Sequence, residues 1–130
     1  ESILVVDDVS EQRELAAKML SKLNYRVTSA SSGEKAVEVL EQQPVDLVVL
    51  DMIMEPGMDG LETYRKVLET RPRQKAIIVS GYSETVRVSE ALRLGVGAYV
   101  KKPYVLEELG SAVKKELGRG TDGDRRRAGA

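Results

Sequence analysis

The sequence predicts a single α/β domain in which a five-stranded parallel sheet is covered by helices on both faces. Four short apolar runs rich in β-branched residues are continuous rather than alternating, which is typical of strands buried on both faces. Amphipathic stretches lie between these runs, and such alternation of strands and helices indicates parallel pairing with right-handed crossovers. The length of 130 residues fits one domain of this kind.

The strands are expected where the apolar runs occur. Continuous runs cover residues 3–6, 47–50, 76–79 and 98–100, and a polar residue follows each of them. A fifth segment, residues 25–30, carries Tyr25, Val27 and Ser29 at alternate positions, which predicts a half-exposed strand at an edge of the sheet.

The starts of the first three helices are expected at polar residues that can act as caps. Ser10 is the expected cap of the first helix. Ser31 with Glu34, and Asp59 with Glu62, have the spacing of a capping box and predict the starts of the second and third helices.

The fourth and fifth helices complete the alternation. Ser83 is the expected cap of the fourth helix, which should end at Gly95. The last helix follows Pro103, and its apolar stripe ends at residue 117. Residues 118–130, which include the run 125–127 of three arginines, lack apolar periodicity, so we expect a domain over residues 1–117 and a flexible tail over 118–130.

The composition excludes several kinds of chemistry and of partner. The chain has no Cys and no His, which removes disulfides, thiolate zinc sites, thiol nucleophiles and histidine-based triads. Its 20 Lys and Arg nearly balance its 21 Asp and Glu, so no global charge favours nucleic acid or an anionic membrane. The apolar runs are far shorter than the ~20 residues of a membrane span, and the first residues lack the basic segment of a signal peptide. We therefore expect a cytoplasmic domain without direct contact to nucleic acid or membrane.

Polar side chains with matching chemistry follow the predicted buried strands. Asp7 and Asp8 follow the first strand, Asp51 the third, Ser80 the fourth, and Lys102 lies just beyond the fifth. The carboxyl ends of parallel strands meet at one edge of a sheet, so we expect these groups to lie close together. Three carboxylates at one edge need a cation, and oxygen ligands alone favour Mg²⁺. One of them can then act as a nucleophile toward a phosphoryl group.

These residues, in this order, resemble the response regulator receiver domain. Asp7-Asp8, Asp51, Ser80, the segment 58–60 (Met-Asp-Gly) and Lys102-Pro103 carry the resemblance, which covers about residues 2–117. It implies a flavodoxin-like, doubly wound sheet with strand order 2-1-3-4-5.

The resemblance also implies a role for each acid. Asp51 would be the phosphoacceptor, taking a phosphoryl group from a phosphohistidine. Asp8 would bind Mg²⁺ directly and Asp7 through water, with Asp51 and the backbone carbonyl of Ile53 completing the protein ligands.

Three further residues match the positions of the family's conserved roles. Lys102 would neutralise charge on the transferred oxygens, and Ser80 and Tyr99 would couple phosphorylation to a partner surface. The implied phosphodonor is a histidine kinase or a histidine phosphotransfer domain. A homodimer could form through the fourth helix, fifth strand and fifth helix.

The sequence is compatible with more than one kind of parent protein and with more than one function. The loop over residues 52–57 is about one residue longer than usual, and with residues 81–83 and 101–104 it resembles receivers at the carboxyl end of bacterial hybrid histidine kinases. A stand-alone or transcriptional response regulator is the alternative. An aspartate-nucleophile phosphohydrolase is disfavoured, because Ile53 occupies the position where such enzymes carry a second acid. The domain is therefore expected to be a signalling module rather than an enzyme.

The lifetime of the phosphorylated state depends on side chains that flank the approach of water. Ile53 and Tyr82 occupy the two flanking positions and are bulky, which predicts slow loss of the phosphoryl group. Glu55 in the longer loop would oppose this if it oriented a water.

Overall fold

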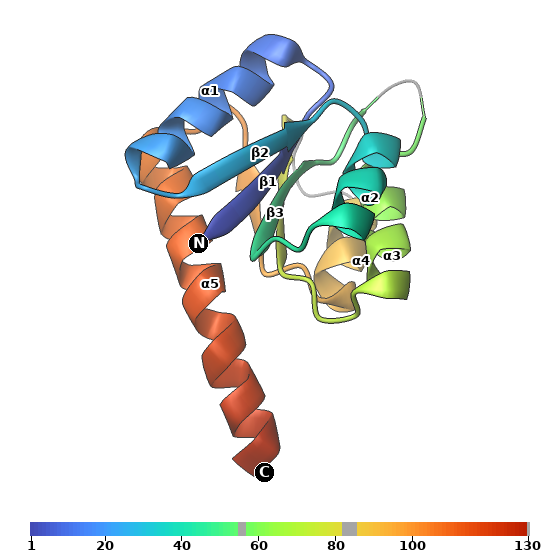
Figure 1. Cartoon of the computed structure of the whole chain (residues 1–130), viewed down its shortest axis with the longest axis vertical. Coiled ribbons are helices and arrows are strands. Elements are labelled where there is room, and N and C mark those ends of the chain that lie inside the picture. The colour runs from blue at the N-terminus through green and yellow to red at the C-terminus, as the bar shows by residue number, and fades with distance from the viewer. Residues whose placement is uncertain (55–56, 82–85, 130) are drawn as a thin grey trace.

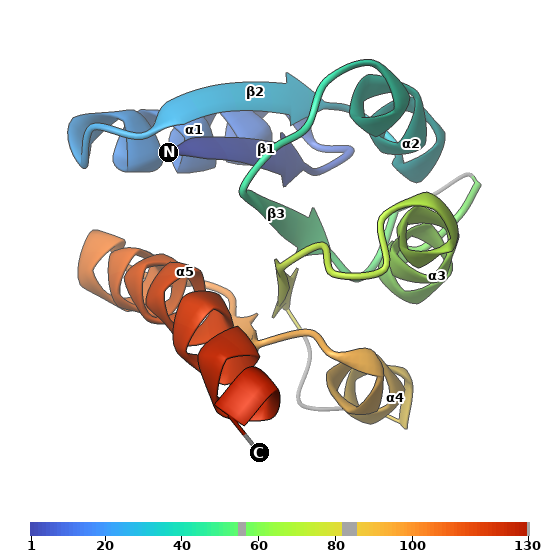
Figure 2. The same ribbon diagram turned by 60° about the horizontal axis from the view of Figure 1, so that its bottom comes forward.

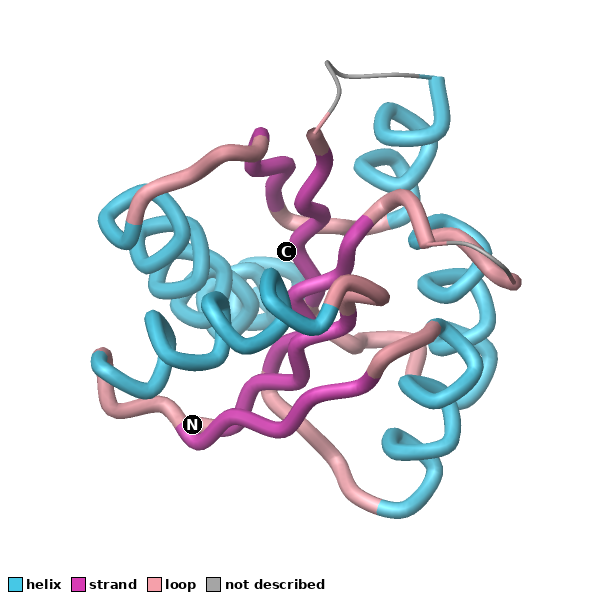
Figure 3. The backbone as a smooth tube through the Cα atoms, turned by 90° about the horizontal axis from the view of Figure 1, so that it is seen from above, coloured by secondary structure: helices cyan, strands magenta, loops and turns pink. Residues whose placement is uncertain are grey.

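The sheet contains five parallel strands in the expected order. The computed structural model describes residues 1–54, 57–81 and 86–129. The strands are β1 (Ser2–Val6), β2 (Arg26–Ala30), β3 (Leu47–Asp51), β4 (Ala76–Ser80) and β5 (Ala98–Lys101). Their spatial order, β2-β1-β3-β4-β5, confirms the doubly wound topology. Viewed from above, the strands form a central layer between two groups of helices (Figure 3).

The helices divide between the two faces of the sheet. The helices α1 (Ser10–Lys22) and α5 (Leu106–Gly129) lie on one face. The other face is covered by α2 (Gly33–Gln42), α3 (Gly60–Thr70) and α4 (Val86–Leu94), as Figures 1 and 2 show. Both faces of the sheet are therefore shielded, as the continuous apolar runs require.

Each strand sends alternate side chains into two separate apolar layers. In β1, Ile3 and Val5 pack toward α1 and α5, whereas Leu4 and Val6 pack toward α2, α3 and α4. This is the period of two that strand geometry imposes. All residues of β3 are buried, including Asp51 at its end. Burial on both faces specifies the pairing register of β3, and the register determines where along the sheet edge Asp51 lies.

The observed helix starts confirm one predicted cap and correct two. The capping box of Asp59 and Glu62 is present at α3, with both reciprocal hydrogen bonds formed. The expectation for Ser10 is wrong, because Ser10 is the first residue of α1 and the preceding turn is held by Asp7, whose Oδ1 accepts a hydrogen bond from the Val9 N–H at 2.9 Å.

The second helix starts one residue later than expected. Ser32, not Ser31, is the N-cap of α2, and its hydroxyl accepts a hydrogen bond from the Lys35 N–H at 3.1 Å. Glu34 does not close a capping box there, since its carboxylate accepts a hydrogen bond from the Met58 N–H at 3.2 Å instead. Ser83, the expected cap of the fourth helix, lies outside the described residues. That helix ends at Leu94 before Gly95 as expected, and Gly95 has a φ of +125°.

The last helix is longer than the apolar pattern predicts. α5 continues to Gly129, and Glu116 and Arg119 form an ion pair at 2.6 Å where the apolar stripe ends. The helix continues beyond Leu117, the last buried residue of the apolar stripe, so the apolar pattern alone marks its end too early. The division into a domain over 1–117 and a flexible tail over 118–130 stays a prediction.

No helix within the described ranges, α5 included, is both long and apolar enough to span a bilayer.

Candidate metal centre

Three carboxylates meet at the carboxyl edge of the sheet. β1 and β3 pair in parallel with Val6 opposite Leu50, so the residues that follow, Asp7 and Asp51, are neighbours. One carboxylate oxygen each from Asp7, Asp8 and Asp51 lie within 4.8 Å of one another. Asp7 and Asp51 are buried, and Asp8 is exposed. The three carboxylates therefore lie close together, as expected, and this spacing would allow one cation to contact more than one of them.

Lys102 supplies a positive charge to the same cluster. Its Nζ lies 3.0 Å from Asp7 Oδ2 and 3.5 Å from Asp51 Oδ1. The pairing of β5 with β4 brings it there, since the Lys102 N–H donates a hydrogen bond to the Ser80 carbonyl at 2.7 Å. Lys102 also donates to Gln12 Oε1 on α1. One ammonium against three carboxylates leaves a formal charge that suits a divalent cation.

The surroundings of Asp51 disfavour its ionised form. Burial raises the pKa of Asp51 to about 6, and the charges of Asp7 and Asp8 push it in the same direction, while the Lys102 ammonium lowers it without offsetting the burial. Burial raises the pKa of Tyr104 as well, and the charges of Asp7 and Asp51 act in the same direction. An all-oxygen donor set with an excess of negative charge fits Mg²⁺ or a similar hard cation.

The start of α3 lies against the end of β3. The Gly60 N–H donates a hydrogen bond to the Met52 carbonyl at 2.7 Å. A Cβ at position 60 would lie 2.6 Å from the backbone oxygen of Asp51, so only glycine permits this approach. The segment 58–60, singled out by resemblance, therefore has a physical reason for its glycine.

Comparison with known proteins establishes the family. A family model described as "Response regulator receiver domain" matches residues 3–114. The chain belongs to this family. Over 117 residues the receiver domain is 34% identical to sporulation initiation phosphotransferase F of Bacillus subtilis, covering 90% of this chain and 94% of that protein. Its structure is similar to that of a CheY-like response regulator receiver domain protein from Methanospirillum hungatei, with a TM-score of 0.88, 27% identity, and coverage of 95% and 98% of the two chains.

Other relatives are much longer than this chain. The sensor kinase CckA of Brucella abortus is 34% identical over 118 residues, which are 89% of this chain but 12% of that protein. Receiver domains thus occur both alone and as parts of larger signalling proteins. The chain is accordingly a receiver domain of two-component signalling, and receiver domains are signalling modules.

The remaining candidate residues lie along the same edge or beneath it. Ser80 is buried at the end of β4, next to β3. Tyr99 is half-buried and packs against the apolar layer beneath α2, α3 and α4. Ile53 lies two residues beyond Asp51, and the residue is 43% exposed. Tyr82 and Glu55 lie outside the described residues.

Two contacts of the site were not expected from the sequence. Arg13 on α1 donates a hydrogen bond from its Nη1 to the Asp7 carbonyl at 2.8 Å, and Gln12 contacts Lys102. Both residues occupy the first turns of an amphipathic helix on its polar side, where sequence period gives no sign of a specific partner. Only their position close behind Asp7-Asp8 could have suggested a role.

Proposed function

We propose that this receiver domain accepts a phosphoryl group on Asp51 from the phosphohistidine of a histidine kinase or a histidine phosphotransfer domain. The observation that supports this most directly is the clustering of one oxygen each of Asp7, Asp8 and Asp51 within 4.8 Å, beside the Lys102 ammonium. Asp51 is the last residue of the buried middle strand, and burial raises its pKa. It also occupies the position that the family resemblance assigns to the phosphoacceptor.

Transfer of the phosphoryl group to Asp51 needs no further reactant. A carboxylate oxygen of Asp51 forms a bond to phosphorus while the bond from phosphorus to the donor's imidazole nitrogen breaks, and that nitrogen keeps the electron pair. Lys102 already contacts Asp51 Oδ1 and would donate to an oxygen of the transferred group. Bound Mg²⁺ would neutralise charge on the acids and on the phosphoryl oxygens. Asp8, Asp7 and Asp51, with the Ile53 carbonyl, are the residues that would hold it.

The proposed output is a change of the surface formed by α4, β5 and α5. The Ser80 hydroxyl lies at the end of the strand next to Asp51 and would move toward a phosphoryl oxygen. Tyr99, half-buried against the apolar layer beneath α2, α3 and α4, would then repack. This surface would contact a partner or a second copy of the chain.

For the parent protein, we favour a cytoplasmic hybrid histidine kinase. Support comes from the longer loop, from the segments 81–83 and 101–104, and from the similarity to a sensor kinase. A stand-alone or transcriptional response regulator is the second candidate, favoured by the near-full coverage of the B. subtilis phosphotransferase.

Intact-mass measurement after incubation with acetyl phosphate and Mg²⁺ tests the proposal. We expect the parent chain to gain one phosphoryl group, and chelation of Mg²⁺ or the substitution Asp51→Asn to prevent the gain. Equal labelling of Asp51→Asn, or none in the parent, would refute the assignment. Continuous release of inorganic phosphate at a rate typical of enzymes would favour a phosphohydrolase instead.

A further inference from the structure

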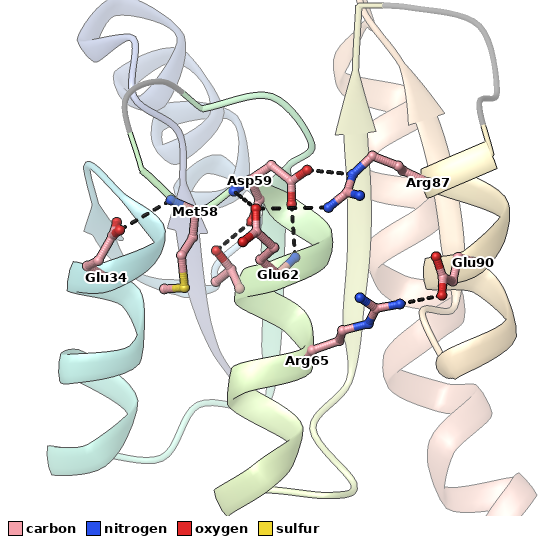
Figure 4. A network of polar contacts seen from close by, with 8 residues as sticks. Glu34, Met58, Asp59, Glu62, Arg65, Arg87 and Glu90 are labelled. Carbon is pink, nitrogen blue, oxygen red and sulfur yellow. Dashed lines mark hydrogen bonds and ion pairs between the residues drawn. The ribbon is translucent and has the colours of Figure 1, made fainter.

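A polar network joins the start of α4 to the start of α3 (Figure 4). Arg87 on α4 donates a hydrogen bond from Nε to Asp59 Oδ2 at 2.6 Å, and its Nη2 lies 3.9 Å from Glu62 Oε1. A second pair, Arg65 on α3 and Glu90 on α4, joins the same two helices further along. The two arginines therefore link the same helices but at different distances from the metal centre.

Arg87 lies at a position where helix electrostatics disfavour it. It is in the first turn of α4, which carries no acidic residue among those described, and a positive charge there opposes the helix dipole. The buried residues of α4 are Val88 and Ala91, whereas Val86 is 80% exposed and Arg87 is also exposed, so the side chain of Arg87 is not held by apolar packing. The partner of Arg87 on α3 accounts for its placement better than its own helix does.

The acid that binds Arg87 is also the residue that anchors α3 behind the phosphoacceptor. Asp59 is the N-cap of α3: its Oδ1 accepts a hydrogen bond from the Glu62 N–H at 2.9 Å while its Oδ2 binds Arg87. The next residue, Gly60, is hydrogen-bonded to the Met52 carbonyl. A continuous chain of short contacts thus runs from the side chain of Arg87 to the backbone next to Asp51.

We propose that Arg87 is a positioning residue for the metal centre, holding the capping box of α3 so that Gly60 fixes the backbone between Asp51 and Ile53. The inference rests on the proposed function, because the backbone that it concerns carries the Mg²⁺ ligands of that function. Arg87 is not assigned a contact with the three carboxylates of the metal centre or with the transferred group. It acts through Asp59.

The ionisation of the pair agrees with this arrangement. Burial acts to raise the pKa of Asp59, but the hydrogen bonds from Arg87 and from the Glu62 backbone outweigh it and lower the pKa. The hydrogen bond to Asp59 in turn raises the pKa of Arg87. Asp59 and Arg87 therefore both stay charged over the pH range in which Asp51 is ionised.

Calorimetric titration of the full chain with Mg²⁺ separates positioning from simple charge. Removing a positive charge near an acidic site should strengthen cation binding slightly, whichever arginine is lost. We expect Arg65→Gln to show this charge effect alone. Arg87→Gln should instead weaken Mg²⁺ binding by up to about threefold, the ratio that corresponds to the whole free energy of one half-exposed ion pair. Equal changes in the two variants would overturn the proposal.

Two further measurements, on Asp59→Asn and on hydrogen exchange at Gly60, test whether Arg87 acts through Asp59. Asp59→Asn retains a good N-cap but loses the ion pair, so it should weaken Mg²⁺ binding as Arg87→Gln does, and the double variant should be no weaker than either single one. Additive losses would overturn the proposal. In metal-free protein, amide hydrogen exchange at Gly60 should accelerate in Arg87→Gln and not in Arg65→Gln; unchanged exchange in both would count against a positioning role. If the parent itself binds no Mg²⁺, the proposed function fails, which is distinct from a parent that binds and variants that match it.

Discussion

Replacing Asp51 by Asn should stabilise the metal-free domain, although Asp51 is the proposed reactive residue. The residue is only 7% exposed, and its ionised form lies beside two other carboxylates. Its pKa rises from 3.8 to about 6. Each pKa unit corresponds to about 1.4 kcal/mol, so keeping Asp51 ionised in the folded state at neutral or higher pH costs about 3 kcal/mol. Asparagine has nearly the same shape and no charge.

The expected gain has a defined pH dependence. Because the folded-state pKa of Asp51 is above its unfolded value, the folded state binds the extra proton between about pH 4 and pH 6, and the stability of the parent falls as pH rises through that window. The free-energy advantage of Asp51→Asn should therefore be about 3 kcal/mol at pH 8 and about half of that at pH 5. Urea unfolding followed by circular dichroism, in buffer with a chelator, measures both values.

A control and a metal addition complete the experiment. Glu14→Gln removes one negative charge from an exposed position on α1 and should change stability little at either pH. Excess Mg²⁺ should stabilise the parent and thereby narrow the gap to Asp51→Asn. An advantage that is absent, or that does not change between the two pH values, would refute the view that Asp51 is held ionised at a cost.

Three further outcomes follow from the same geometry. Asp8→Ala should abolish the rise in thermal melting temperature that Mg²⁺ produces in the parent; a shift of unchanged size would remove Asp8 from the metal centre. Gly60→Ala should destabilise the fold by more than about 1 kcal/mol and slow phosphorylation, because its Cβ would lie 2.6 Å from the backbone oxygen of Asp51; urea unfolding and intact mass measure both effects, and a neutral result would contradict the close approach. Phosphorylation should shift the NMR signals of Ser80 and Tyr99 together, and shifts confined to the Asp51 loop would argue against coupling between them.

The sheet was predictable because its signal is strong and local. The run 47–50 has no polar residue, is too short for a helix, and ends at a carboxylate, so it could be placed as a buried strand that delivers Asp51 to the sheet edge. Strand order and the roles of individual residues came from resemblance, since single-sequence patterns do not determine which parallel strands are neighbours. The clustering of Asp7, Asp8, Asp51 and Lys102 then follows from topology alone.

The parts that were missed depend on choices between chemically equal residues. Ser31 and Ser32 are equally good caps by residue type, so the sequence alone does not choose between them. In the structure Ser32 is the cap, and Gly33 after it packs closely against α3, where a Cβ would lie 2.0 Å from Thr63 Oγ1. The contact of Glu34 with the Met58 N–H could not be predicted, because a capping box is the more common use of a Glu at that spacing. Nothing in the sequence pattern pairs Arg87 with Asp59, because the two residues are far apart in the chain and belong to different helices.

The distribution of packing between the two faces of the sheet indicates where a signal can travel. α1 and α5 close one face with a continuous apolar layer that includes Leu20, Leu109 and Val113, all fully buried. On the other face α4 is held by Val88 and Ala91 together with ion pairs at its surface. Segments with few buried apolar groups open at the lowest cost in free energy. A change at Asp51 that reaches β4 and β5 will therefore displace α4 more readily than α5, and salt, which screens the ion pairs of α4, should make that displacement easier.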